Sequence, residues 1–222
     1  MKKYQLILCF ILILAFMLAC APEQKISTTI TKPDAKVNVG QAVQEPSTEP
    51  KQQISSEVKG LLDKSKTNVK SIYYKYRGPE TGNNFYEFYV KGNKIKYKPA
   101  LEIKSLDKKE SYDSIYIDKI AHTAQSYCDA IYCLYKGKTE DLNYRDVYIS
   151  TIIDWVDGIT EAKKVGEEII DRRNTWKIES NKGILWVDTL YGVPLKIESS
   201  GKKYRFEQIS FSSVEDADVV PS

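Results

Sequence analysis

Five segments in the last third of the chain constrain the fold most, because most of them alternate apolar and polar residues and only short connections separate them. These segments are residues 162–171, 175–180, 184–188, 193–199 and 203–211. Alternation with a period of two predicts a strand with one buried face. Short connections require neighbouring strands to pair antiparallel. The last third of the chain therefore predicts an antiparallel meander.

Further strands are predicted before the meander. They cover residues 72–77, 85–90, 95–98, 114–118 and 121–127. Gly92-Asn93 separates the second and third of these segments, and both residue types tolerate the positive φ of a tight hairpin turn. We therefore expect most of the domain to form one sheet.

Two segments carry the helical spacing of apolar residues instead. Ile54, Val58 and Leu61 lie on one stripe of a helix. A broad apolar face predicts a second helix over residues 146–157, and Gly158 suits the position just past its end. The prediction is an α+β fold in which two or more helices close a strongly curved antiparallel sheet of about eight or nine strands, an incomplete β-barrel.

The first twenty residues predict export and a lipid anchor. Thirteen consecutive apolar residues run from Leu6 to Leu18. The run is short for a bilayer core of about 30 Å, but it suits the apolar region of a secretory signal. Met17-Leu18-Ala19-Cys20 resembles the lipobox of bacterial-type lipoproteins. The resemblance implies cleavage after Ala19 and a diacylglyceryl group on Cys20 that holds the protein on a membrane. An uncleaved signal anchor and an ordinary cleaved signal are the alternatives.

A disordered tether is expected between the anchor and the folded part. Residues 21–52 contain four of the eight prolines and no aromatic residue, so they cannot bury enough apolar surface to offset their ordering entropy. We predict a lipoprotein signal peptide over 1–19, the anchor cysteine and tether over 20–52, and the folded domain over 53–222. The 33 basic residues face 30 acidic ones, and this balance predicts no nucleic-acid partner.

Parts of the predicted sheet resemble the LolA/LolB family of lipoprotein carriers. Ile184-Leu185-Trp186-Val187-Asp188, with the later Gly192-Val193-Pro194-Leu195-Lys196, is similar to a strand–turn–strand pattern of that family, and residues 69–76 resemble part of its opening. The resemblance implies an incomplete barrel, closed on one side by helices, whose interior can hold acyl chains. One departure is the lipid anchor, which the soluble carriers of that family lack. In this pattern Asp188 is expected to accept hydrogen bonds from turn amides.

These features predict a non-catalytic, extracytoplasmic lipoprotein that is anchored to a cell membrane or envelope. It would bind or transfer lipid or an acylated protein in an apolar cavity. The residues predicted to line this cavity are Tyr148, Ile152, Trp155, Trp176 and Trp186. The alternative for each of them, which the sequence favours, is a plain core position. The alternative function is an envelope structural or interaction lipoprotein whose own side chains fill the cavity, and a third is a hydrolase without a recognisable motif.

Little in the chain points to catalysis or to a metal. Cys128 and Cys133 are close enough in sequence to bridge across a tight turn, and a disulfide is the expected state in an exported protein. His122 is the only histidine, so a metal site would lack ligands. The sequence has no G-x-S-x-G, phosphate-binding glycine loop or H-E-x-x-H motif. We therefore predict no enzyme activity, no metal and no cofactor.

A lysine-rich stretch in the middle of the chain has two interpretations. Seven lysines stand against two acidic residues between positions 91 and 109. In the first interpretation, Lys91, Lys94, Lys96 and Lys98 contact anionic headgroups, each contributing up to about 1 kcal/mol. In the second, the lysines solvate a sheet edge and protect it from aggregation.

Overall fold

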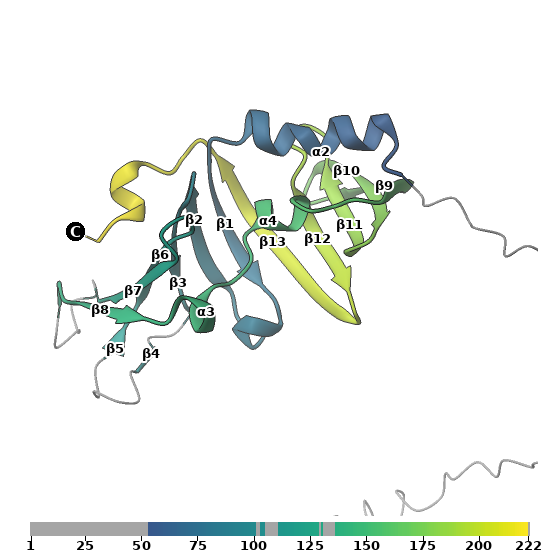
Figure 1. Cartoon of the computed structure of the whole chain (residues 1–222). Coiled ribbons are helices and arrows are strands. Elements are labelled where there is room, and N and C mark those ends of the chain that lie inside the picture. The colour runs from purple at the N-terminus through teal and green to yellow at the C-terminus, as the bar shows by residue number, and fades with distance from the viewer. Residues whose placement is uncertain (1–52, 101–102, 105–110, 129, 131–135, 222) are drawn as a thin grey trace, which may run out of the picture. The chain divides into compact units, whose positions relative to one another are not determined.

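The structure is a computed structural model, and it describes residues 53–100, 103–104, 111–128, 130 and 136–221. The described residues belong to one compact unit that spans Glu49–Ser222. The predicted signal peptide, Cys20 and the whole predicted tether lie outside the described residues. Within the unit, an eleven-stranded antiparallel sheet carries helices on one face (Figure 1).

The strands of the main sheet pair in an order that runs from β8 at one end to β9 at the other. In spatial order they are β8 (Thr139–Leu142), β7 (Thr123–Tyr127), β6 (Ser114–Asp118), β3 (Lys94–Lys98), β2 (Tyr86–Lys91), β1 (Ser71–Arg77), β13 (Lys202–Phe211), β12 (Pro194–Ser199), β11 (Gly183–Asp188), β10 (Arg173–Ser180) and β9 (Ala162–Ile170). Strands β4 (Ile103–Lys104) and β5 (Ser111–Tyr112) form a separate pair. In the described part of the chain, β8 and β9 do not pair with each other, so the sheet is open.

The helical elements are short apart from the first. They are α2 (Ser56–Asn68), α3 (Tyr144–Val147) and α4 (Ile152–Val156), with 3-10 turns η1 (Pro79–Thr81) and η2 (Asp216–Val219). Helix α2 confirms the first predicted helix. The Ser55 side chain caps it by accepting from the Val58 amide at 3.4 Å, and its apolar stripe, including Leu61, is buried.

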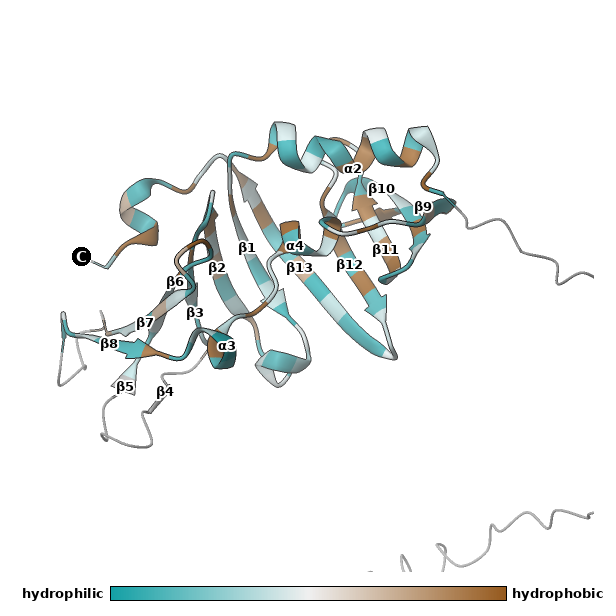
Figure 2. Cartoon of the chain, viewed as in Figure 1, coloured by the Kyte–Doolittle hydropathy of each residue, from teal (hydrophilic) through white to brown (hydrophobic). Residues whose placement is uncertain are grey.

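The predicted curved antiparallel sheet is confirmed, but the predicted number of strands was too low. Strand β8 is the main-sheet strand that the sequence does not predict, because Thr139-Glu140-Asp141-Leu142 has little apolar alternation. Elsewhere apolar and polar residues alternate visibly along the strands, as in β12 (Figure 2). This alternation separates an inner face, covered by α2 and α4, from an outer face.

The single helix predicted over residues 146–157 is wrong, because α3 ends at Val147 and the separate helix α4 begins only at Ile152. The chain is extended at Thr151, with φ −73° and ψ 166°. Thr151 starts α4 with a capping box: its hydroxyl oxygen accepts from the Asp154 amide at 3.3 Å, and the Asp154 carboxylate accepts from its amide at 2.7 Å. Gly158 lies just past α4 with φ +74°, in agreement with the prediction.

The turn between β11 and β12 brings the sheet into contact with α2. The Asp188 carboxylate accepts from the Leu190 and Tyr191 amides, both at 2.8 Å, which confirms the predicted role of Asp188. Gly192 follows with φ +69°, and a Cβ built on it would lie 2.3 Å from the Leu61 carbonyl oxygen in α2. Only glycine fits this turn without displacing the helix.

Candidate functional site

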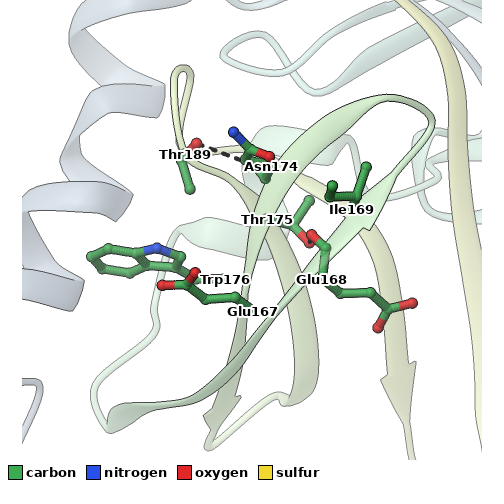
Figure 3. A pocket seen from close by; sticks show the side chains of 7 residues that line it. All are labelled: Glu167, Glu168, Ile169, Asn174, Thr175, Trp176 and Thr189. Carbon is green, nitrogen blue, oxygen red and sulfur yellow. Dashed lines mark hydrogen bonds between the residues drawn. The ribbon is translucent and has the colours of Figure 1, made fainter.

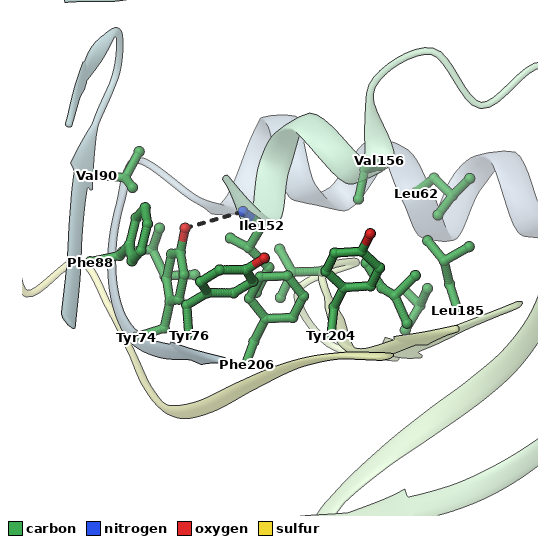
Figure 4. Packing of buried hydrophobic residues seen from close by; sticks show 14 of the residues in the cluster. Leu62, Tyr74, Tyr76, Phe88, Val90, Ile152, Val156, Leu185, Tyr204 and Phe206 are labelled. Carbon is green, nitrogen blue, oxygen red and sulfur yellow. Dashed lines mark hydrogen bonds between the residues drawn. The ribbon is translucent and has the colours of Figure 1, made fainter. Parts of the chain in front are cut away.

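Five aromatic residues form a continuous buried surface on the inner face, which we call the aromatic floor. They are Tyr74, Tyr76, Phe88, Tyr97 and Phe206, and each is at most 3% exposed. The Tyr74 and Phe88 rings stack with centroids 5.2 Å apart, and the Phe88 and Tyr97 rings stack at the same distance. Figure 4 shows part of this packing beneath α2 and α4. The floor gives the inner face a large apolar area.

Residues 143–157, which we call the cover segment, cross the aromatic floor. Ile152 of this segment is fully buried in the main core cluster. The Tyr74 hydroxyl oxygen accepts from the Ile152 amide at 3.2 Å (Figure 4), and the Tyr97 hydroxyl donates to the Val147 carbonyl at 2.8 Å. Tyrosine hydroxyls of the floor thus satisfy backbone groups of the cover segment that its short helices leave unpaired.

A cluster around Asp154 fastens the cover segment to the sheet. The carboxylate accepts from the Tyr148 hydroxyl at 2.6 Å, from the Thr151 amide and hydroxyl at 2.7 and 2.6 Å, and from Lys119 in the β6–β7 turn. Burial raises the Asp154 pKa, but the hydrogen bonds from Lys119, Thr151 and Tyr148 outweigh it and lower the pKa below its ordinary value. Burial and the neighbouring carboxylate raise the pKa of Tyr148 well above its ordinary value. Tyr148 therefore serves this cluster as a hydrogen-bond donor.

The Lys182 ammonium holds the other end of the cover segment. It donates to the Asp154 carbonyl at 2.8 Å and also to the Asp157 carbonyl, so it pairs with carbonyl groups at the end of α4. Burial lowers the pKa of Lys182. The cover segment is thus attached through polar contacts at both ends of α4, while its apolar side chains pack against the core cluster.

Trp155 packs on the inner face, and its indole nitrogen has an unusual environment. Its ring lies 4.7 Å from the Tyr204 ring, centroid to centroid. Its indole nitrogen is buried and has no hydrogen-bond acceptor among the described residues. A buried donor without an acceptor costs about 1–3 kcal/mol. The indole N–H is therefore a position at which a ligand oxygen would be stabilised.

Trp176 lies at a recess of about 520 Å³ near the end of the β9–β10 hairpin (Figure 3). The Lys164 ammonium covers its ring at 3.8 Å from the centroid and also contacts the Glu167 carboxylate at 2.6 Å. The Thr175 hydroxyl donates to the Glu168 carbonyl at 2.6 Å. Much of the polar lining is therefore paired within the protein, and the recess offers little for a ligand to satisfy.

The structure groups four of the five predicted lining residues and separates the fifth. Tyr148, Trp155 and Trp176 pack against the main core cluster that contains Ile152. Trp186 lies instead in a smaller cluster with Ile170 and Leu195. Its neighbours in β11 point to the inner face, so Trp186 points to the outer face, where its indole N–H donates to the Glu168 carboxylate at 2.6 Å. The prediction that Trp186 lines the same cavity is corrected.

The predicted headgroup lysines lie in the β2–β3 hairpin. Lys94, Lys96 and Lys98 alternate with buried residues of β3, which pairs with both β2 and β6. For these lysines the alternative interpretation as a sheet edge is therefore wrong, because β2 and β3 are interior strands. Lys91 pairs with Asp216 at 3.1 Å, and the Lys96 ammonium lies 5.1 Å from the centre of the Tyr116 ring. A headgroup role for these lysines stays a prediction.

A second cavity, which we call the Lys70 pocket, opens beside the cover segment and has a volume of about 200 Å³. Its apolar lining consists of Val69, Ile72, Val90 and Ile153, and its polar lining consists of Ser65, Lys66, Lys70, Ser71, Gly92, Lys119 and Thr151. Ile72 and Val90 belong to the main core cluster. This pocket therefore connects the surface with the buried inner face, and sequence reasoning missed it.

The remaining predicted positions give no further site. Cys128 is buried just after β7, but Cys133 lies outside the described residues, so the disulfide stays a prediction. His122 is exposed in the β6–β7 turn, with its ring 5.1 Å from the Tyr144 ring. In the described part of the chain, no group of three potential metal-ligating side chains gathers, and no helix has the length and apolarity needed to cross a bilayer.

Comparison with known proteins gives only distant structural likenesses. No family model and no curated protein matches the chain. An uncharacterized conserved protein from Thermus thermophilus has 10% identity and a TM-score of 0.44, covering 74% of this chain and 93% of its own. MucB has 10% identity and a TM-score of 0.44, and the match covers 76% of this chain and 64% of the MucB chain. The Mycobacterium tuberculosis lipoprotein LppX has 13% identity and a TM-score of 0.41, and the match covers 72% of this chain and 96% of the LppX chain. Likenesses at this level assign no function to the chain.

Proposed function

We propose that the protein is an extracytoplasmic lipoprotein that binds lipid or an acylated protein, without catalysis, by holding an acyl chain between the aromatic floor and the cover segment. The observation that carries the proposal is the construction of the inner face. An apolar surface in an open sheet is enclosed by a segment of two short helices, and the attachments of that segment include hydrogen bonds and an ion pair. Such attachments can be exchanged for water when the cover moves.

Two further observations support a ligand at this place. The Trp155 indole N–H is buried without an acceptor among the described residues, and an acyl ester carbonyl is one group that would accept from it. The Lys70 pocket gives access to the inner face at Ile72 and Val90. In this proposal the cover segment moves away from the floor as the chain enters, because the floor residues are close-packed in the present conformation.

The membrane attachment belongs to the same proposal and rests on the sequence. A diacylglyceryl group on Cys20 and the tether that follows would keep the folded unit close to a lipid surface. An acyl-binding face held there would meet lipid at a high local concentration. Mass spectrometry of the mature chain tests the attachment, because Met1 retained on the product would contradict it.

Ligand binding is tested with the compact unit, residues 49–222, purified without detergent. We expect native mass spectrometry to reveal co-purifying lipid, and a lipid-free sample to take up a fluorescent fatty acid. Trp155 provides an internal reporter, because movement of the cover segment changes its contact with Tyr204. Tryptophan emission should therefore change when an unlabelled fatty acid is added.

Two matched variants locate the site. Trp155→Phe should remove most of the emission change, whereas Trp186→Phe should keep it, because Trp186 lies in the other cluster. An emission change that depends on Trp186 rather than Trp155 would place binding on the outer face. A unit that neither carries lipid nor takes up fatty acid would refute the proposal.

One observation favours a second candidate function, an envelope interaction protein with a filled interior. Tyr74 and Phe206 in the middle of the floor are fully buried, and their rings are 5.6 Å apart, centroid to centroid. Their packing leaves no preformed space for a chain at that point. Failure of the unit to take up fatty acid would favour this function.

A further inference from the structure

The Lys70 pocket combines an aliphatic wall with cationic groups, and from this combination we infer that the bound ligand is an anionic amphiphile. Its charged head would lie between Lys66 and Lys70, and its chain would run toward Ile72 and Val90. This inference rests on the proposed function and deepens it by naming the chemical class of ligand. Neither the floor nor the Trp176 recess requires a charged ligand.

The apolar part of the pocket is continuous with the core. Ile72 is 1% exposed and Val90 is 5% exposed, and both belong to the cluster that contains the aromatic floor. Val69 and Ile153 complete this wall. A hydrocarbon chain that enters here therefore meets apolar side chains of the core cluster, and each buried methylene contributes about 0.8 kcal/mol in transfer terms.

The polar part of the pocket carries three ammonium groups from three separate places in the chain. Lys66 lies in the last turn of α2, Lys70 lies between α2 and β1, and Lys119 lies in the β6–β7 turn. Ser65 and Thr151 add hydroxyl groups. Lysine is a compact point charge that suits carboxylate and phosphate groups alike. The shared chemistry of the head is thus a small oxyanion.

The existing ion pairs leave a positive charge for the ligand. Lys119 is committed to Asp154, whose carboxylate is largely buried. Lys66 pairs with Asp157 at 3.1 Å, but both side chains are about half exposed, at 60% and 48%. An exposed ion pair contributes little free energy, so the Lys66 ammonium can leave Asp157 and bind a ligand at small cost. Lys70 has no ion-pair partner in the part of the chain that the structure describes.

The orientation of the ligand follows from this distribution of charge. The cations line the same pocket as Gly92 of the β2–β3 turn, whereas the aliphatic wall leads inward. An uncharged amphiphile would gain the same burial but would leave Lys70 without an ion-pair partner among the described residues. Among ligands of equal chain length, the pocket should therefore discriminate by the charge of the head.

The test compares three ligands of equal chain length on the compact unit, residues 49–222, by isothermal titration calorimetry: dodecanoate, dodecanol and dodecyl phosphate. We expect both anions to bind at least tenfold more tightly than dodecanol, which corresponds to about 1.4 kcal/mol. The preference should decrease as salt is added, because the charges are partly exposed. Acetate and inorganic phosphate serve as competitors without a chain, and neither should displace dodecanoate at comparable concentration.

The matched variants are Lys66→Gln with Lys70→Gln, and Lys163→Gln with Lys202→Gln as a control on exposed strand positions. The first double variant should lose the preference for anions and bind dodecanol as before, whereas the control should keep the preference. Equal binding of dodecanol and dodecanoate would overturn the inference and leave the proposed function standing. Binding of none of the three would overturn both. Displacement by acetate or inorganic phosphate, or a preference that survives in the first double variant, would overturn the inference alone.

Discussion

Asp154→Asn tests whether the Asp154 cluster holds the cover segment in place. One carboxylate oxygen accepts from Lys119, and the other accepts from the Tyr148 hydroxyl and from the amide and hydroxyl of Thr151. The asparagine NH₂ group replaces one of these oxygens, and in either orientation it faces a donor. The least costly orientation gives up the bond from Lys119 and keeps the other three.

The magnitude follows from that single loss. A hydrogen bond to a charged group contributes about 1.5–3 kcal/mol, and the side chains of Asp154 and Lys119 are only 18% and 27% exposed. We therefore expect the free energy of unfolding to fall by about 2–3 kcal/mol. For a unit of this size that is roughly 5–10 °C in Tm. Urea denaturation followed by circular dichroism measures the change.

Asp157→Asn is the matched control, because Asp157 lies three residues further on and makes an exposed pair with Lys66. It should change the free energy of unfolding by less than about 0.5 kcal/mol, as is usual for surface pairs. The reasoning is refuted if the two variants are equally stable, or if Asp154→Asn costs less than about 1 kcal/mol.

Three other outcomes follow from the same structure. The folded pKa of Asp154 lies below its unfolded value of about 3.9. The stability that its carboxylate contributes is therefore present at neutral pH and is lost as the pH falls below about 4. The difference in free energy of unfolding between wild type and Asp154→Asn should accordingly close in acid titrations. Gly192→Ala should lower the free energy of unfolding in urea by about 2–4 kcal/mol, because its new Cβ would lie 2.3 Å from the Leu61 carbonyl oxygen. Gly201→Ala has open space and a similar φ, so it should lower that free energy by only about 1 kcal/mol. Equal losses would contradict the steric argument. Phe206→Ala should cost about 3–5 kcal/mol by thermal unfolding, since its ring is fully buried in the floor, and a small loss would indicate a loosely packed interior.

The strands were predictable because they are defined by local alternation and by short connections. Residues 162–211 show both signals, and the structure pairs their strands in chain order. The Gly92 turn and the Asp188 turn were also predictable, because the residues that shape them are neighbours in sequence. Elements of this kind can be predicted without knowledge of the rest of the fold.

The cover segment could not be predicted from its apolar residues alone. Tyr148, Ile152 and Trp155 do face the core cluster, but tertiary bonds divide the segment into two helices. The Tyr74 hydroxyl reaches it from β1 and Lys119 reaches it from the β6–β7 turn, both far away in sequence. Long-range partners of this kind override a helical pattern that is locally consistent.

Trp186 was placed with the wrong residues for a related reason. It lies in the uninterrupted apolar run Ile184-Leu185-Trp186-Val187, and such a run does not tell which side chains face inward. The Lys70 pocket was out of reach of sequence reasoning because its lining comes from the end of α2, β1, the β2–β3 hairpin, the β6–β7 turn and the cover segment. Only the assembled fold brings Val90 and Lys119 to the same place.

The pairing of β1 with β13 sets the order in which the sheet can be completed. Ile72 lies beside Phe211 in this pairing, so the two halves of the sheet meet through residues near the beginning and the end of the folded unit. A chain synthesised from its N-terminus presents β1 long before β13 emerges, and contacts so distant in sequence form slowly. Until then one side of β1 exposes unpaired amides and carbonyls, which makes the newly made chain dependent on protection from aggregation at that strand.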